Sequence, residues 1–163
     1  MHIRRLRAED WGQVWLMLQA TFASGDTYAF APDSTEEEIY KLWVQAPWAT
    51  YLACLDDGTI VGTYFLKANQ PGLGSHVCNC GYVVVAHARG RGVASAMCEH
   101  SQREALAQGF RAMQFNLVVA TNETAVRLWQ RLGFHVAGML PGAFRHLQLG
   151  YVDAYVMFKQ LVN

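Results

Sequence analysis

The sequence predicts a domain of mixed α/β (α+β) class, in which a central sheet of about seven strands is flanked by about four helices. Three observations indicate this class. Apolar residues recur at helical spacing in the first quarter of the chain, and short apolar runs bounded by glycine, proline or asparagine follow. A strand, helix, strand unit then occupies the middle of the chain. Because such a crossover joins parallel strands, we expect a mixed sheet.

Two helices are expected in the first quarter of the chain, separated by a turn-rich loop at residues 24–33. The first begins near Asp10, and its apolar residues recur on one helical face. These are Trp11, Val14, Trp15, Leu18 and Phe22. Ser34 and Glu37 match a capping box ahead of the second helix. Pro47 ends that helix, because proline lacks the N–H that a helix interior requires.

Alternation and turn residues predict the strands. An Asp57-Gly58 turn joins two of them into a hairpin, and the run 76–86 ends in almost continuous apolar residues, which indicates burial on both faces. The expected strands are 2–7, 48–55, 60–66, 76–86, 112–120, 134–140 and 150–158. Two later helices are expected at 92–108 and 121–132, the second with Asn122 as its N-cap and Gly133 as its stop.

Composition favours one compact domain over residues 1–163. Hydrophobic residues make up 52% of the chain and charged residues 16%, which excludes a disordered or low-complexity protein. No apolar run approaches the ~20 residues of a membrane span, and no signal peptide is recognised, so we expect a cytoplasmic protein that does not bind membranes. The four cysteines are expected as reduced thiols. No metal site is expected, because Cys78 and Cys80 are separated by a single residue.

Charge is distributed unevenly along the chain. The net charge is zero, but residues 1–57 carry −5 and residues 58–163 carry +5. The basic, arginine-weighted part suits a ligand that bears phosphate, although a solvated face of ordinary charge explains it equally well.

Residues 89–94 (RGRGVA) lie between the apolar strand and its crossover helix. Gly90 and Gly92 allow backbone N–H groups to turn toward an anion, the helix N-terminus favours negative charge, and Arg89 and Arg91 can bond phosphate oxygens. A pyrophosphate is the expected ligand, although a purely structural turn explains the glycines equally well. The segment lacks the Gly-Lys-Ser/Thr of a P-loop and the G-x-G-x-x-G of a dinucleotide fold. No basic run or aromatic platform accompanies it, so we expect no nucleic-acid partner.

Two segments carry a family resemblance. Arg89-x-x-Gly92-x-Ala94 resembles the pyrophosphate loop, Q/R-x-x-G-x-G/A, of the GCN5-related N-acetyltransferase (GNAT) family. The following helix is similar to that family's N-x-x-A-x-x-x-Y-x-x-x-G-F/Y. It reads Asn122-x-x-Ala125-x-x-x-Trp129-x-x-x-Gly133-Phe134. The resemblance implies a splayed mixed sheet that admits acetyl-CoA as cosubstrate between the fourth and fifth strands.

The resemblance also implies a set of cofactor contacts. Backbone groups of the strand at Val83, Val84 and Val85 pair with the pantetheine arm, and the loop from Arg89 through Gly90, Arg91, Gly92 and Val93 to Ala94 holds the pyrophosphate. On the later helix, Asn122 contacts the pantetheine, and Ala125, Arg127 and Leu128 flank the cofactor. Trp129 takes the place of the tyrosine that protonates the leaving thiolate. Its indole N–H is a poor proton source, so Trp129 packs beside the thioester or belongs to the core.

The acceptor side departs from the family pattern. The fourth strand lacks the carboxylate that many relatives use as a base, and His76 is the nearby group with a suitable ordinary pKa. Segments around Asn79, Tyr82 and Asn116 resemble the yeast proline-analogue N-acetyltransferases, which acetylate azetidine-2-carboxylate, and this likeness covers chiefly residues 60–160. On that match Asn79 and Asn116 occupy substrate-side positions, and Tyr82 replaces an aromatic wall residue.

Strand alternation predicts where these side chains point. It places Asn79, Gly81, Val83 and Val85 on one face of the fourth strand, and Asn116 and Val118 on one face of the fifth. The expected activity is direct acetyl transfer from acetyl-CoA to a small amine, with His76, Asn79 and Asn116 as the candidate catalytic residues. A non-catalytic acyl-CoA-binding module and a protein N-terminal or lysine acetyltransferase stay open as alternatives. Low charge and five tryptophans suggest a homodimer.

Overall fold

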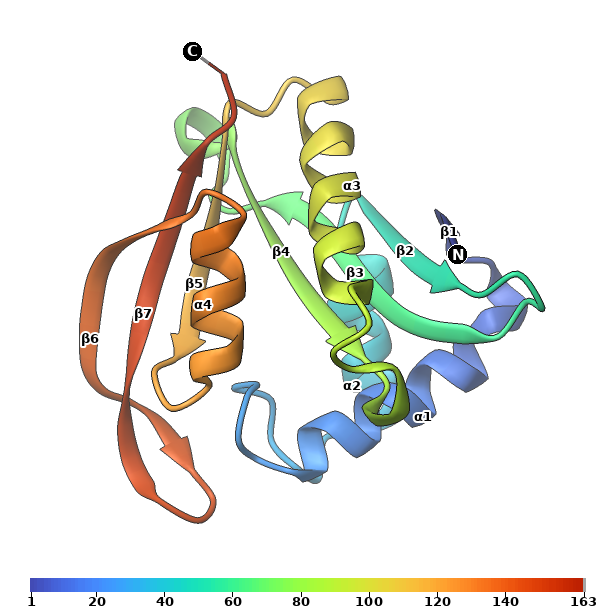
Figure 1. Ribbon diagram of the computed structural model, residues 1–163, viewed down its shortest axis with the longest axis horizontal. Coiled ribbons are helices and arrows are strands. Elements are labelled where there is room, and N and C mark those ends of the chain that lie inside the picture. Colours follow the sequence, from blue (N-terminus) through green and yellow to red (C-terminus); the bar gives the residue numbers. More distant parts are fainter. Residues whose placement is uncertain (163) are drawn as a thin grey trace.

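The protein folds around one seven-stranded mixed sheet in the order β1-β2-β3-β4-β5-β7-β6. This description rests on a computed structural model, which describes residues 1–162. The strands are β1 (His2–Arg5), β2 (Ala49–Cys54), β3 (Ile60–Ala68), β4 (Val77–Val84), β5 (Ala112–Val119), β6 (His135–His146) and β7 (Gly150–Gln160). All neighbouring pairs are antiparallel except β4 and β5, which are parallel. The predicted mixed α/β class is therefore confirmed (Figure 1).

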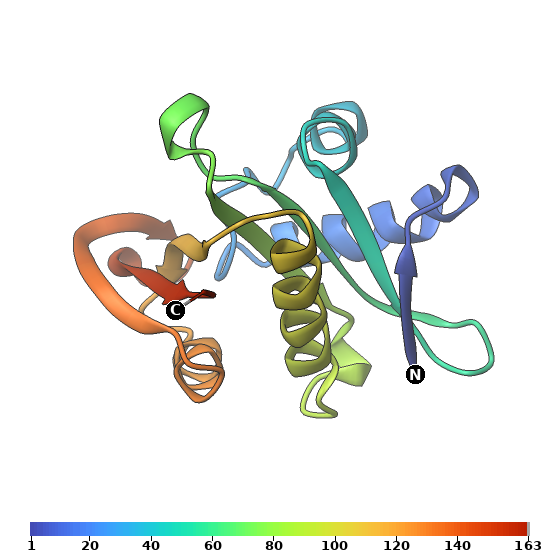
Figure 2. The ribbon, with the colours of Figure 1, turned by 90° about the horizontal axis from the view of Figure 1, so that it is seen from above.

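Helices cover both faces of the sheet. The α-helices are α1 (Trp11–Ala23), α2 (Glu36–Tyr40), α3 (Val93–Ala107) and α4 (Glu123–Arg131). Short helical turns lie at Ala8–Asp10, Lys41–Gln45, Gly72–Gly74 and Ala86–Ala88. Figure 2 shows α1 and α2 on one face and α3 and α4 on the other. None of the described helices is both long and apolar enough to span a membrane.

Each face of the sheet has its own hydrophobic core. Side chains such as Met97, Met113 and Phe115 pack between the sheet and α3 and α4. Leu18, Trp43 and their neighbours pack between the sheet and α1 and α2. Alternation along the strands divides the apolar residues between these two cores, because successive side chains point to opposite faces.

The start of α2 differs from the prediction by one residue. The N-cap is Thr35 rather than Ser34: Glu38 N–H donates to Thr35 Oγ1 at 3.3 Å, and Thr35 N–H donates to Glu38 Oε2 at 2.8 Å. Ser34 donates to the Ala31 carbonyl oxygen at 2.7 Å instead. Both pairs fit the capping-box spacing, so the sequence alone could not choose between them.

The end of α2 and the length of β6 also differ from the prediction. The α-helix gives way after Tyr40 to a π turn, in which Ala46 N–H bonds the Lys41 carbonyl oxygen at 2.8 Å. Strand β6 runs past Leu140 to His146 because a register shift between Leu140 and Phe144 takes up Pro141, which cannot donate a ladder hydrogen bond.

Candidate active site

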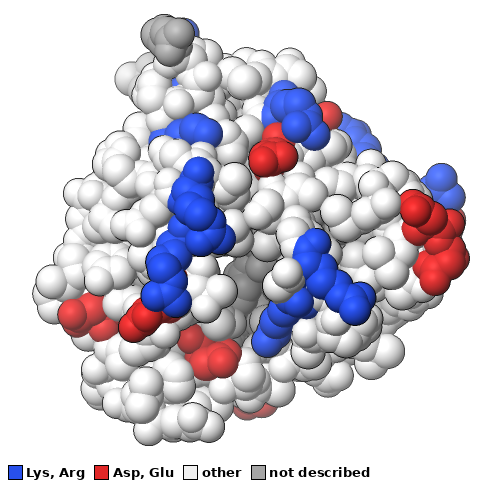
Figure 3. Space-filling model, in the orientation of Figure 1, with Lys and Arg blue, Asp and Glu red and all other residues white. Residues whose placement is uncertain are grey.

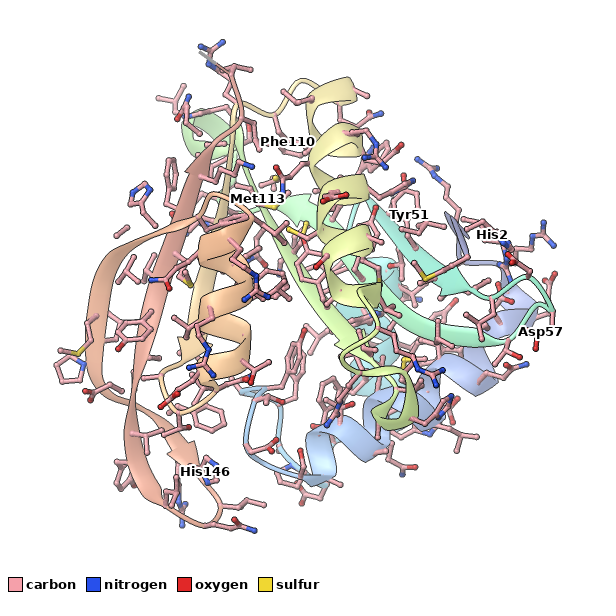
Figure 4. All side chains as sticks on the ribbon, viewed as in Figure 1. His2, Tyr51, Asp57, Phe110, Met113 and His146 are labelled. Atoms are coloured by element: carbon pink, nitrogen blue, oxygen red, sulfur yellow. The ribbon has the colours of Figure 1, made fainter. Side chains whose placement is uncertain are left out.

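Strands β4 and β5 begin side by side and then separate, which leaves a gap between their backbones, called the opening below (Figure 1). Their pairing is limited to Val77 with Ala112 and Cys78 with Met113. Just beyond it, Asn79 Nδ2 donates to the Gln114 carbonyl oxygen at 2.8 Å. Met113 marks the closed end of this opening, between α4 and α3 (Figure 4). The splayed sheet that the resemblance implies is thus present.

The hydrogen bonds of β3 decide which backbone groups of β4 face the opening. Val85 N–H donates to the Val61 carbonyl oxygen at 3.0 Å, and Asn69 N–H donates to the Val77 carbonyl oxygen at 2.8 Å. Alternate residues of an antiparallel strand turn their backbone groups to the same neighbour, so the odd-numbered residues of β4 face β3. The backbone groups of Cys80, Tyr82 and Val84 therefore face the opening, beyond the last β4–β5 pair.

This register corrects the pantetheine contacts expected at Val83 and Val85. The backbone of Val83 pairs with β3, the Val85 N–H bonds the Val61 carbonyl of β3, and the Val85 carbonyl accepts from Ala88 N–H. The Val83 side chain is buried against the α1 and α2 face of the sheet. Of the three valines, Val84 alone turns its backbone toward the opening. The family pattern could not show whether the odd-numbered or the even-numbered residues of β4 turn their backbone groups toward the opening. That choice depends on how β4 pairs with its neighbour, which an isolated strand does not specify.

The loop before α3 presents free N–H groups to solvent. Gly90 and Gly92 have φ of +73° and +79°, and apart from the adjoining residues no described atom lies within 4 Å of the position that a Cβ would take at either one. The first helical bond runs from Ala96 N–H to the Gly92 carbonyl oxygen, so the N–H groups of the first turn have no helical partner. A helix of 15 residues begins here, and its dipole favours an anion at this end.

Basic side chains flank the opening on both sides. Arg89 and Arg91 are exposed in the loop before α3, and Arg127 and Arg131 are exposed on α4. Figure 3 shows two groups of basic side chains, one at the start of α3 and one over α4, with a hollow between them. Arg127 also pairs with Glu123 at 3.0 Å within α4. Four of the nine basic residues in the basic part of the chain, residues 58–163, therefore lie on the two elements that flank the opening.

Comparisons with known proteins agree with this geometry. Residues 12–134 match the model of the acetyltransferase (GNAT) family. The chain belongs to the GNAT family. Over 99 residues it is 39% identical to N-acetyltransferase aca1 of Schizosaccharomyces pombe, which covers 60% of this chain and 47% of that protein. Over 108 residues it is 33% identical to the L-amino acid N-acetyltransferase AaaT of Escherichia coli, which covers 65% of this chain and 64% of that protein.

A solved structure extends the likeness to nearly the whole chain. The GCN5-related N-acetyltransferase from Kribbella flavida superimposes with a TM-score of 0.92 and 41% identity, and the match covers 98% of this chain and 96% of that one. The chain spans about half the length of aca1 and less than two thirds of AaaT. The predicted family resemblance is confirmed, including its likeness to a yeast N-acetyltransferase.

In this GNAT chain, α4 lines the side of the opening nearer β5. Asn122 caps the helix by accepting from Ala125 N–H at 3.3 Å, as expected, and its Nδ2 has no partner among residues 1–162. The half-buried Ala125 and Leu128 pack against the core under α3 and α4. Trp129 is 8% exposed and belongs to the same core. The core-aromatic interpretation of Trp129 therefore applies, and the thioester contact stays a prediction.

Tyr82 lies on the face of the sheet that carries α3 and α4. Its ring centroid is 5.1 Å from that of Trp129, and its hydroxyl bonds Ser101 Oγ at 2.7 Å. Burial raises the pKa of the Tyr82 phenol well above its ordinary value. Asn79 points to the opposite face, so the structure does not bring Tyr82 and Asn79 into one acceptor pocket.

His76 lies away from the opening. It is exposed, its Nδ1 is 3.1 Å from the Leu73 carbonyl oxygen, and its own carbonyl accepts from Arg111 N–H at 2.8 Å. It precedes the paired residues of β4, whereas the opening begins after them. This placement argues against His76 as the base.

Asn116 is exposed in an amide network on β5. Its Oδ1 accepts from Gln114 Nε2 at 2.9 Å, and its Nδ2 donates to Asn69 Oδ1 at 2.7 Å. The expectation that Asn116 and Val118 share a face is wrong. A register shift between Phe115 and Val118 interrupts the alternation, and Val118 is buried in the α3 and α4 core.

The acceptor side contains residues that the sequence analysis missed. Tyr28, in the loop between α1 and α2, donates from its hydroxyl to the Tyr82 carbonyl oxygen at 2.8 Å. The tip of the β6–β7 hairpin, near the labelled His146 in Figure 4, reaches the same loop. Leu147 N–H donates to the Gly25 carbonyl oxygen at 3.1 Å there. A tyrosine within a turn-rich loop gives no periodic signal, so only the tertiary structure reveals it.

The cysteines offer no nucleophile. All four are free and buried. Burial raises the pKa of the Cys80 thiol well above its ordinary value and that of Cys98 to about 11. Because the thiolate is the reactive form, the thiols of Cys80 and Cys98 are unreactive at neutral pH. Among the described residues, no three His, Cys, Asp or Glu side chains are placed to hold a metal ion.

Proposed function

We propose that this GNAT protein transfers an acetyl group directly from acetyl-CoA to the amine of a small molecule, an amino acid or a proline analogue. The main support for this proposal is a row of backbone N–H donors that runs from β4 to the start of α3. The N–H groups of β4 that face the opening lead toward the free N–H groups at the start of α3. An extended ligand that ends in a pyrophosphate fits such a row.

Each part of acetyl-CoA has candidate contacts. The loop Arg89–Ala94 holds the pyrophosphate through its N–H groups and through Arg89 and Arg91. The backbone N–H groups of Tyr82 and Val84 donate to the carbonyl oxygens of the pantetheine amides, in place of the groups expected at Val83 and Val85. The free Nδ2 of Asn122 supplies a further donor from α4. The thioester then lies near Cys80 and Trp129.

The reaction needs one bond made and one broken. The neutral amine attacks the thioester carbonyl carbon, a β4 N–H that faces the opening polarises the carbonyl oxygen, and the C–S bond breaks to release the thiolate of CoA. The nitrogen must lose one proton as the amide forms. Since Asn79 is not basic and His76 lies elsewhere, water accepts that proton. The cofactor occupies the α3 and α4 side, and the acceptor approaches from the α1 and α2 side, where Asn79 and Tyr28 lie.

Two alternatives predict different outcomes in one experiment. The purified protein is mixed with acetyl-CoA and a panel of amines that includes azetidine-2-carboxylate, other amino acids and peptides, and both thiol release and product mass are measured. We expect turnover with small amino or imino acids. Binding of acetyl-CoA without turnover on any amine would establish an acyl-CoA-binding module. Turnover on peptides alone would establish a protein acetyltransferase.

The similarity to AaaT, whose name describes an L-amino acid N-acetyltransferase, supports an amino acid as the acceptor. We also propose that residues 1–163 act as one N-acetyltransferase domain. A homodimer and a cytoplasmic location stay predictions. The side chains exposed on β6 and β7, such as Met139 and Tyr151, are candidates for a dimer contact.

A further inference from the structure

Lys67 lies near the end of β3, directly opposite Asn79 in the β3–β4 pair. Its side chain is half-buried, and its Nζ lies 5.4 Å from the centroid of the Phe65 ring. Phe65 is two residues earlier on the same strand, so the side chain of Lys67 folds back along β3. The ammonium group therefore lies over the α1 and α2 face of the sheet, away from α3 and α4.

Lys67 differs from the other lysines in its partners. The chain has three lysines. Lys41 pairs with Glu37 at 2.7 Å, and Lys159 donates to Gln102 Oε1 at 2.6 Å and to the Leu132 carbonyl oxygen at 2.7 Å. Within residues 1–162, the ammonium group of Lys67 makes neither an ion pair nor a hydrogen bond. It makes a cation–π contact with the ring of Phe65. A half-buried ammonium without an anion is suited to bind one.

The Phe65 ring connects Lys67 to the opening between β4 and β5. A Cβ placed on Gly81 would lie 2.6 Å from Cε1 of Phe65 and 3.1 Å from the hydroxyl of Tyr28. Gly81 itself lies between Cys80 and Tyr82, whose N–H groups face the opening. Lys67, Phe65, Gly81 and Tyr28 thus share one face of the sheet, on the opposite side from the proposed cofactor groove.

We propose that Lys67 binds the carboxylate of the acceptor and so selects α-amino and α-imino acids over other small amines. This inference rests on the proposed acetyltransferase function and names its substrate class. An amino acid carries its carboxylate two bonds from its amine nitrogen. The Phe65 ring and the Tyr28 hydroxyl fill the space in front of Gly81, so an acceptor held by Lys67 brings its amine to the opening only when these two side chains move aside. The charge of Lys67 complements that carboxylate, and the ammonium supplies three donors.

The test compares Lys67→Met with the unaltered protein on two matched acceptors, azetidine-2-carboxylate and its carboxamide. Methionine keeps an unbranched, flexible side chain over Phe65 but removes the charge. We expect kcat/KM for the carboxylate to fall by about tenfold to a hundredfold, mainly through KM, as a lost charge-assisted hydrogen bond predicts. The carboxamide should be used equally well by both proteins, and KM for acetyl-CoA should not change.

Two further variants serve as controls. Lys41→Met removes the same charge from an exposed ion pair on the helical segment after α2 and should leave both acceptors unaffected. Lys67→Arg keeps the charge with a different shape and should restore part of the preference for the carboxylate. Thermal unfolding of each variant tests its folding, and Lys67→Gln replaces Lys67→Met if the latter does not fold.

The outcomes separate the two proposals. If the unaltered protein acetylates both acceptors and Lys67→Met lowers both rates equally, or lowers neither, then Lys67 does not recognise a carboxylate, and the acetyltransferase function stands. If the unaltered protein acetylates none of the amino acids or their amides, the proposed function fails, and the role of Lys67 fails with it.

Discussion

The side-chain amide of Asn79 bonds the main-chain carbonyl of Gln114 at 2.8 Å, one residue past the last pair of β4 and β5. Where a parallel ladder would continue with a backbone N–H of β4, the side chain supplies the donor instead. Asn79 therefore helps to set the point at which the two strands separate, and its predicted role at the substrate is joined by a structural one.

Replacing Asn79 by alanine should lower stability. The half-buried Gln114 carbonyl loses its donor, which costs about 1–3 kcal/mol in the free energy of unfolding, measured by urea denaturation. Asn79 is 8% exposed, so water cannot fully replace its amide.

Asn116→Ala provides the matched amide control. Asn116 is exposed, so the unfolding free energy should change by no more than about 0.5 kcal/mol, whereas kcat/KM for the acceptor should fall at least about tenfold. Equal losses of stability in the two variants would contradict the role of Asn79 at the strand separation. Full activity of Asn116→Ala would remove Asn116 from the acceptor site.

Gly92→Glu should weaken acetyl-CoA binding at least about tenfold in a calorimetric titration, because the new carboxylate repels the pyrophosphate at the N-terminus of α3. Binding should also weaken as salt is added, since Arg89 and Arg91 are exposed. The control is Gly58→Glu. Gly58 has φ of +88° against +79° at Gly92, and both sites have open space for a Cβ, so both variants carry similar backbone strain. Equal affinity in the two variants would rule out the pyrophosphate assignment.

Trp129→Tyr should leave turnover equal to or above that of the unaltered protein, because the new hydroxyl can protonate the leaving thiolate. The loss of packing against Tyr82 and Phe115 should cost about 1–2 kcal/mol of stability. Trp129→Phe is the comparison without a hydroxyl, and its turnover should be the lower of the two. A large loss of turnover in both variants, with folding intact by circular dichroism, would show that the indole itself is required.

Asp10 should make stability depend on pH. Its carboxylate bonds Arg4 through two contacts of 2.7 and 2.8 Å and accepts from Arg7 N–H at 2.8 Å. The hydrogen bond from Arg4 lowers the pKa of Asp10 below its ordinary 3.8. A group with a lowered pKa in the folded state stabilises the fold above its ordinary pKa, and this stabilisation is lost as the pH falls through the folded value.

The comparison of the unaltered protein with Asp10→Asn measures this contribution. At neutral pH the variant should be less stable by about 1–3 kcal/mol, and the difference should shrink below about pH 4 as Asp10 becomes protonated. A difference that stays constant down to pH 2 would show that the charge of Asp10 is not responsible.

Several features were predictable because their signals are local. The helical spacing of Trp11 to Phe22, the turn at Asp57-Gly58 and the cap at Asn122 depend on neighbouring residues, and the structure contains all three. The positive φ values of Gly90 and Gly92 also agree with the turn expected at residues 89–94, whereas its binding of pyrophosphate stays a prediction. Where local rules allowed two solutions, as at Ser34 and Thr35, the prediction missed by one residue.

The sequence by itself determined the mixed fold and the family and predicted an anion-binding loop, since periodicity, caps and glycine spacing act within one segment. Only the tertiary structure decided that Tyr82 and Val84 rather than Val83 and Val85 face the opening, because that parity follows from the pairing of β4 with β3. The tertiary structure also places the Phe65 ring beside both Lys67 and Gly81, and it places His76 next to Leu73, away from the opening. Such contacts join separate strands and loops, and no local pattern encodes them.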